Sequence, residues 1–174
     1  MTVDNAEERW KIIGYEFKDP EILDEARTRK SYRNENPSGT SECMDPLATL
    51  GDAILDAVVV YQLYKDGERR KGKLTENKIN HIKRTRTRQF AENNQLGKYI
   101  RWGKGEDQDE IWNKGDHALD TVTEALIGAI FLDAEKAGVN GLKTVQELLV
   151  DMKFFEMDVE NCQTGECYRN DIPR

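Results

Sequence analysis

Five acidic side chains stand out in this sequence because they lie at helical spacing within two largely apolar stretches. They are Asp45, Asp52, Asp56, Asp120 and Glu124. On a helix, Asp120 and Glu124 lie one turn apart on the same face, where like charges repel. Aligned carboxylates on a mostly buried helix are costly unless something compensates them. A bound metal ion can do this, and so can Arg or Lys side chains; alternatively, Asp45 caps its helix and the acids that follow it face solvent.

A basic segment separates the two acidic stretches. Residues 69–88 hold nine Lys or Arg and a single acid, Glu76, in a chain whose formal net charge is −7. Because binding to phosphates depends on the field at the contact surface, an acidic protein with such a segment can still bind a nucleic acid. The segment is equally well explained as a solvated helix face, or by ion pairs with acids elsewhere in the chain.

Long helices must position these acids. In a helix predicted over residues 45–65, the acids lie opposite an apolar side made of Leu47, Leu50, Ile54, Ala57, Val58 and Tyr61. A second long helix is predicted over residues 117–135, with a core stripe of Leu119, Val122, Leu126, Ala129 and Ile130. Between them, a basic helix is expected to start near Lys73 with Thr75 as its cap. These periodic segments, with few prolines, predict an all-α chain.

Length and composition bound the class of protein. The 174 residues, 37% of them apolar, suffice for one domain, expected over residues 1–158, with a loosely held tail over residues 159–174. No apolar run reaches the roughly 18 residues of a membrane span. The first residues also lack the features of a signal peptide, so we expect a cytoplasmic location and no membrane partner. The three cysteines are scattered and lack the spacing of a zinc site.

Six motifs in chain order resemble the ribonuclease III endonuclease domain. Leu50-Gly51-Asp52-Ala53-Ile54-Leu55 is similar to the family's signature helix, and residues 124–133 are similar to its second conserved helix. Further matches, in order along the chain, are residues 13–17, 28–32, 71–75 and 103–106. The resemblance spans residues 8–155. It implies an endonuclease domain that stands alone, without the double-stranded-RNA-binding domain usual in the family.

The resemblance also implies an all-α fold that homodimerises around a cleft for double-stranded or structured RNA. By this resemblance the protein hydrolyses phosphodiester bonds, with Asp52 and Glu124 as catalytic residues. Its cofactor would be Mg²⁺, with Mn²⁺ as an alternative, held by Asp52, Glu124, Asp120 and Asp45. The basic segment would supply the RNA contacts, expected from Arg70, Lys71, Lys73, Lys78, Lys83 and Arg84.

The chain departs from the family pattern at two of the usual four metal ligands. Ala48 stands where the signature has its first Glu, and Thr121 stands where the second helix has an Asp. Asp120, one residue earlier, replaces that Asp only if the helix rotates or bulges locally. Asp45 or Asp56 is expected to reach the place left by Ala48, because both lie on the same stripe of the helix.

Three functions follow from these observations. The first is a metal-dependent endoribonuclease with a rearranged set of ligands. The second is a catalytically inactive, dimeric RNA-binding or scaffold protein, which is favoured by Ala48, Thr121 and by Lys71 in place of a family Glu. The third is an unrelated helical protein whose acids are structural, and it predicts no RNA binding. The first two predict a dimer built on the apolar face of the central helix.

Overall fold

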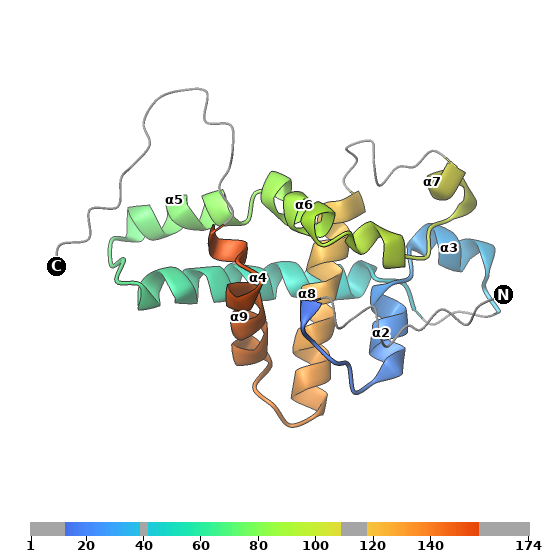
Figure 1. Ribbon diagram of the computed structural model, residues 1–174, viewed down its shortest axis with the longest axis horizontal. Helices are drawn as coiled ribbons and strands as arrows, with labels where there is room; N and C mark the ends of the chain where they lie inside the picture. The colour runs from blue at the N-terminus through green and yellow to red at the C-terminus, as the bar shows by residue number, and fades with distance from the viewer. Residues whose placement is uncertain (1–12, 39–41, 109–117, 157–174) are drawn as a thin grey trace.

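The computed structural model describes residues 13–38, 42–108 and 118–156. Among these residues the regular elements are helical, which confirms the all-α prediction. They are α2 (Pro20–Ala26), α3 (Lys30–Glu35), α4 (Asp45–Lys65), α5 (Lys71–His81), α6 (Arg84–Asn93), η2 (Leu96–Tyr99), α7 (Lys104–Gln108), α8 (Ala118–Lys136), α9 (Gly141–Asp151) and η3 (Phe154–Glu156). In Figure 1, α4 and α8 run across each other at the centre of the molecule. The predicted tail at residues 159–174, and with it the boundary at 158, lies outside the described residues.

Glycines set the distance between α4 and α8. A Cβ atom at Gly51 would lie 1.8 Å from the carbonyl oxygen of Glu124, and one at Gly128 would lie 2.1 Å from the carbonyl oxygen of Leu47. No side chain fits in either place, so the two backbones are in direct contact. The residue that follows Gly51 is Asp52, and the close approach therefore brings an acid of α4 against the acids of α8.

The face of α4 that packs into the core differs from the predicted one. Its buried residues are Leu47, Ala48, Gly51, Leu55, Val58 and Val59, whereas Ala57 and Tyr61 are exposed. At about 100° per residue, the observed face is rotated by about a quarter turn from the predicted one. The prediction was wrong because residues 53–61 are apolar almost all round, so their periodicity does not select one side. The rotation places Asp52 at the edge of the buried face and not opposite it.

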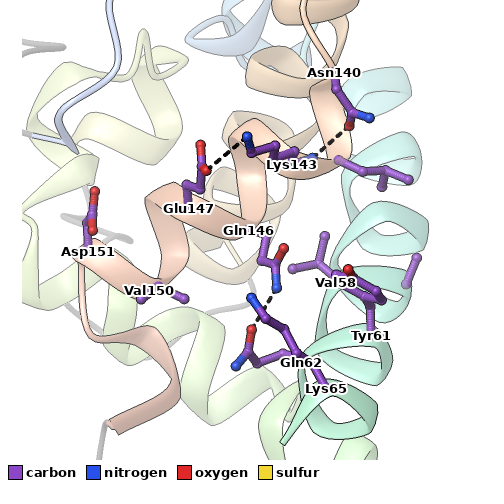
Figure 2. A pocket seen from close by; sticks show the side chains of 12 residues that line it. Val58, Tyr61, Gln62, Lys65, Asn140, Lys143, Gln146, Glu147, Val150 and Asp151 are labelled. Atoms are coloured by element: carbon purple, nitrogen blue, oxygen red, sulfur yellow. Dashed lines mark hydrogen bonds and ion pairs between the residues drawn. The ribbon is translucent and has the colours of Figure 1, made fainter.

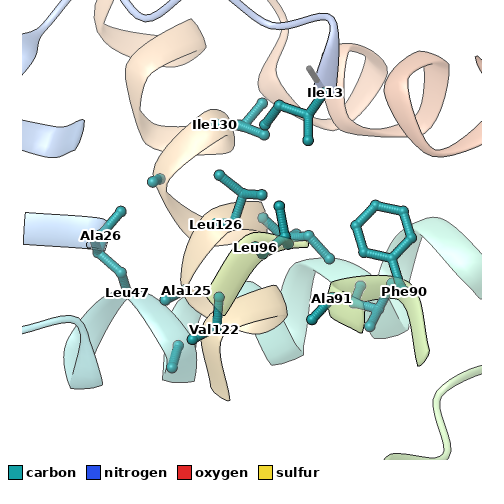
Figure 3. Close-up of a cluster of buried hydrophobic side chains, with 14 of the residues drawn as sticks. Ile13, Ala26, Leu47, Phe90, Ala91, Leu96, Val122, Ala125, Leu126 and Ile130 are labelled. Carbon is teal, nitrogen blue, oxygen red and sulfur yellow. The ribbon is translucent and has the colours of Figure 1, made fainter. Parts of the chain in front are cut away.

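The core is built around α8. The five residues predicted for its stripe are all buried, namely Leu119, Val122, Leu126, Ala129 and Ile130. Figure 3 shows Leu126 and Ile130 gathered with Leu47 of α4 and with Phe90 of α6. By length and composition alone α4 could cross a membrane. Its packing against α8 explains the same apolar content, because a core helix of a domain must also be apolar.

The basic segment folds as two helices, whereas one was predicted. The first, α5, begins at Lys71, ahead of the predicted start, and ends at His81. The second, α6, begins at Arg84 after Lys83, whose ψ of 137° interrupts the helical path. Thr75 is not a cap, because its hydroxyl donates to the carbonyl oxygen of Lys71 inside α5. The break redirects the chain so that α6 packs against α8.

Buried polar contacts fix the position of α6. Nη2 of Arg86, a residue that is 6% exposed, donates to the carbonyl oxygen of Phe154 at 2.9 Å. From α8, the hydroxyl of Thr123 donates to the carbonyl oxygen of Thr87 at 2.8 Å. Both contacts are buried, where a hydrogen bond left unmade is expensive. The first turn of α6 is therefore held firmly beside the acids of α8.

Asp133 ties the segment before α2 to α8. Its carboxylate is fully buried and accepts hydrogen bonds from the hydroxyl of Tyr15 at 2.6 Å, the amide of Asp19 at 2.7 Å and the amide of Lys18 at 3.0 Å. A buried charge is tolerated when it is hydrogen-bonded in this way. Asp19 in turn caps α2, since its Oδ1 accepts from the amide of Glu21 at 2.9 Å.

Candidate active site

Three carboxylates, from Asp52, Asp120 and Glu124, form the acidic cluster of this structure. Asp52 lies on the exposed edge of α4, and the other two lie one turn apart on α8. The pKa of Glu124 is raised to about 7, first by burial and then by the negative charges of Asp52 and Asp120, against the opposing charge of Arg84. The negative charges of α4 and α8 therefore act on one another, because the two helices cross in close contact at Gly51.

Asp120 is the most deeply buried member of the acidic cluster, at 6% exposed. Its Oδ2 lies 3.7 Å from Nε of Arg84. Its Oδ1 is buried and has no hydrogen-bond partner within the described part of the chain. A buried carboxylate oxygen without a partner is costly. Such an oxygen is satisfied by a cation that reaches it from the side of the cluster.

The donor set of the acidic cluster fits a hard divalent cation. Mg²⁺ and Mn²⁺ prefer carboxylate oxygens and keep several waters, so they do not require a closed protein cage. The orphaned Oδ1 of Asp120 is an oxygen that such a cation would satisfy. Among the described residues, however, no three His, Cys, Asp or Glu side chains are already gathered as a metal-binding group. Asp52, Asp120 and Glu124 are thus neighbours that must close further to share one ion.

Neither candidate for the place left by Ala48 joins the acidic cluster. Asp56 accepts from Nζ of Lys78 at 2.7 Å and is tied to α5 by this ion pair, so its part in replacing the missing Glu stays a prediction. Asp45 lies exposed in the first turn of α4. At 1.5 Å per residue it is roughly 10 Å along the helix axis from Asp52. The structure therefore does not bring Asp45 together with the other three acids.

The six basic residues predicted to contact RNA fall into two groups. Four of them form ion pairs, namely Arg70 with Glu68 at 3.0 Å, Lys73 with Glu76 at 3.0 Å, Lys78 with Asp56 at 2.7 Å and Arg84 with Asp120 at 3.7 Å. The other two, Lys71 and Lys83, are exposed at the starts of α5 and α6. Arg86, from the same basic segment, is a structural residue buried under Phe154. Most of the residues predicted to contact RNA are therefore already engaged in ion pairs within the chain.

A groove between the second half of α4 and α9 is a feature that sequence reasoning missed. Its volume is about 840 Å³, and its apolar lining is Ala57, Val58 and Tyr61 of α4 with Leu142 and Val150 of α9. Figure 2 shows Gln62 and Gln146 joined across it, by a hydrogen bond of 2.7 Å. The sequence indicates this groove through the apolar residues that α4 carries nearly all round. A helix that buries only one side needs apolar residues on that side alone, so the others point to a second contact surface.

Comparisons with known proteins bear on this arrangement. Residues 19–150 match the family model described as Ribonuclease-III-like. The chain is 34% identical over 145 residues to Ribonuclease 3 of Lactiplantibacillus plantarum, covering 82% of this chain and 59% of that protein. It is 32% identical over 152 residues to Ribonuclease 3 of Limosilactobacillus fermentum, covering 86% of this chain and 65% of that protein. The chain thus spans about three fifths of the length of these relatives.

Two solved structures of a nuclease domain have a fold similar to that of this chain. One is the nuclease domain of ribonuclease III from Campylobacter jejuni, described with structural flexibility in the region involved in dimer formation. It superposes with a TM-score of 0.73 at 26% identity, covering 88% of this chain and all of that domain. A second structure of the same domain, at 2.2 Å resolution, gives a TM-score of 0.67 at 26% identity, covering 86% of this chain and 93% of that one.

Proposed function

Because this chain belongs to the ribonuclease III family, we propose that it is a metal-dependent endoribonuclease that cleaves double-stranded or structured RNA. The observation that carries the proposal is the orphaned, buried oxygen of Asp120 next to Glu124 and Asp52. Three carboxylates held close together by two crossing helices repel one another and so lower the stability of the fold. Acids in such an arrangement are typical of a functional site, here one that would bind a divalent cation and an RNA phosphate.

The side chains divide the work by their positions. Asp52, Asp120 and Glu124 would hold Mg²⁺ or Mn²⁺ through carboxylate oxygens. When bound, the ion supplies an activated water for in-line attack on the phosphodiester and positive charge at the leaving oxygen. Glu124, whose pKa is raised to about 7, holds a proton on its carboxyl group in part of the metal-free molecules at neutral pH and gives it up when a cation is bound.

Binding of RNA is assigned to the basic segment. Lys83 is exposed and adjoins Arg84, which borders the acidic cluster, so these two cations lie beside the proposed cleavage site. Lys71 is exposed at the start of α5, away from the crossing of α4 and α8, and would contact a more distant part of the RNA. Their contacts would be with phosphates, which hold the substrate without reading its sequence. So few phosphate contacts predict weak binding to RNA that is lost as salt rises. We place this activity in the cytoplasm, with no membrane partner.

A second copy of this chain is the proposed protein partner. The side of α4 that faces away from α8 exposes Tyr61 and Tyr64, at 57% and 51%, and continues into the groove against α9. Large apolar side chains exposed in a row are typical of a surface that a partner covers. A symmetric dimer covers the same patch on both copies.

The alternative function is a catalytically inactive, dimeric RNA-binding or scaffold protein. Ala48 and Thr121 favour it, because they leave three clustered carboxylates that are not yet gathered as a metal-binding group. A labelled RNA duplex, incubated at low salt with and without Mg²⁺ or Mn²⁺, separates the two functions. The Asp52→Asn, Glu124→Gln double variant controls for a contaminating nuclease.

We expect metal-dependent cutting that the double variant loses. A duplex that shifts in a gel but stays intact with either metal would replace the nuclease by the RNA-binding alternative. If the duplex is neither cut nor shifted in the gel, both functions are refuted for duplex RNA.

A further inference from the structure

Arg84 reaches the acidic cluster from α6, and only its backbone is firmly held. Its Nε lies 3.7 Å from Oδ2 of Asp120, which is longer than a hydrogen bond, and its side chain is 75% exposed. The residues just after it are fixed, since Arg86 bonds to Phe154 and Thr87 accepts from α8. The guanidinium is therefore delivered to the cluster on a rigid support but is free to swing away into solvent.

The two partners of this ion pair are unequally placed. The side chain of Asp120 is 9% exposed, whereas that of Arg84 is 75% exposed. An ion pair with one solvated partner contributes little energy. It also satisfies only one carboxylate oxygen, because Oδ1 of Asp120 stays buried without a partner in the described part of the chain. Arg84 therefore compensates the charge of Asp120 incompletely and can be replaced by a stronger cation.

We propose that Arg84 is a resident counter-ion of the acidic cluster and that a divalent cation displaces it from Asp120 on binding. The inference rests on the proposed function, because it takes the acidic cluster as the metal site. It adds a regulatory role for Arg84 to the RNA contact predicted from the sequence. Without metal, the guanidinium offsets part of the repulsion among the three carboxylates. With metal, the same charge opposes the incoming ion, so Arg84 sets the metal concentration at which the site fills.

The sign of the expected effect distinguishes a counter-ion from a structural residue. Removing a positive charge from the edge of a cation site strengthens cation binding. The coupling typical of an exposed ion pair corresponds to a change in Kd of roughly 1.5-fold to fivefold. A residue that only shaped the site would have the opposite effect, because its loss would leave the carboxylates less well placed for the ion.

The test is a titration of Mn²⁺ followed by electron paramagnetic resonance of the free ion, which needs no RNA and no catalysis. The variants are Arg84→Gln, which removes the charge, and Arg84→Lys, which keeps it. Arg88→Gln is the matched control, since Arg88 lies one turn further along α6 and pairs with Glu92 at 2.7 Å. Circular dichroism checks that each variant keeps its helical fold, as expected for changes at exposed or half-buried side chains.

We expect Arg84→Gln alone to bind Mn²⁺ more tightly, by roughly 1.5-fold to fivefold, with Arg84→Lys and Arg88→Gln close to the unaltered protein. Unchanged or weaker binding by Arg84→Gln overturns the counter-ion role and leaves the endoribonuclease proposal to the cleavage assay. An equal gain in Arg88→Gln also overturns it, since the effect would then be one of net charge. If neither the unaltered protein nor any variant binds Mn²⁺, the metal site is refuted and the counter-ion role falls with it.

Discussion

Replacing Gly51 by alanine tests whether the crossing of α4 and α8 creates the acidic cluster. The new Cβ would lie 1.8 Å from the carbonyl oxygen of Glu124 and 2.7 Å from the amide nitrogen of Gly128. A close contact between carbon and oxygen is about 3.3 Å, so the helices must separate by about 1.5 Å at this point. Backbone atoms obstruct the methyl group here, and they cannot swing aside as the end of a side chain can.

The magnitude follows from two opposing terms. Alanine in place of a helical glycine gains about 1 kcal/mol of helix propensity. Overpacking a core costs about 1–3 kcal/mol and more where backbones must move, and here the affected contact joins the two central helices. We expect a net loss of about 2 kcal/mol in the free energy of unfolding, measured by urea denaturation. Gly72→Ala on α5 is the control, because its Cβ meets nothing within 4 Å and only the gain in propensity remains.

Gly51→Ala should also change the pKa of Glu124 and the cleavage activity. Moving α4 away from α8 carries Asp52 away from Glu124. The repulsion from the Asp52 carboxylate, which raises the pKa of Glu124, then becomes weaker. A lower pKa of Glu124 in carbon-detected NMR, together with a loss of metal-dependent cleavage, would link packing to the site. A Gly51→Ala protein as stable and as active as the unaltered one would refute the reasoning, since the crossing would then not set the position of the acids.

Two further predictions concern buried acids. In the metal-free protein, the raised pKa of Glu124 contributes stability that is fully present below the ordinary pKa of 4.5 and is lost as the pH rises through about 7. The free energy of unfolding in urea should therefore decline across this range, and Glu124→Gln should abolish the decline. A decline that persists in the variant would contradict this prediction. Asp133→Asn should lower the free energy of unfolding by about 3 kcal/mol, because the buried carboxylate accepts from Tyr15 and from the amides of Lys18 and Asp19. A loss below about 1 kcal/mol in thermal or urea unfolding would show that the neutral amide serves as well.

Local sequence rules were sufficient where one face of a helix is clearly apolar. The α8 stripe from Leu119 to Ile130 is buried as predicted. It rests on the spacing of apolar residues within one helix, which the sequence displays directly. The basic segment was harder. Its break at Lys83 follows from the packing of α6 on α8, a contact that no local pattern reveals.

The sequence by itself determined the all-α class, the two acid-bearing helices, the family resemblance and the departures from it at Ala48 and Thr121. Only the tertiary structure decided which acids meet. Residues 53–61 are apolar almost all round, so the contact through Gly51 and Gly128 selected the buried face of α4 and set Asp52 beside Glu124. Likewise, the tertiary structure pairs Asp56 with Lys78 and Asp120 with Arg84. These partners lie 22 and 36 residues apart, and periodicity describes only neighbours on one helix, so the choice of partner belongs to the packing.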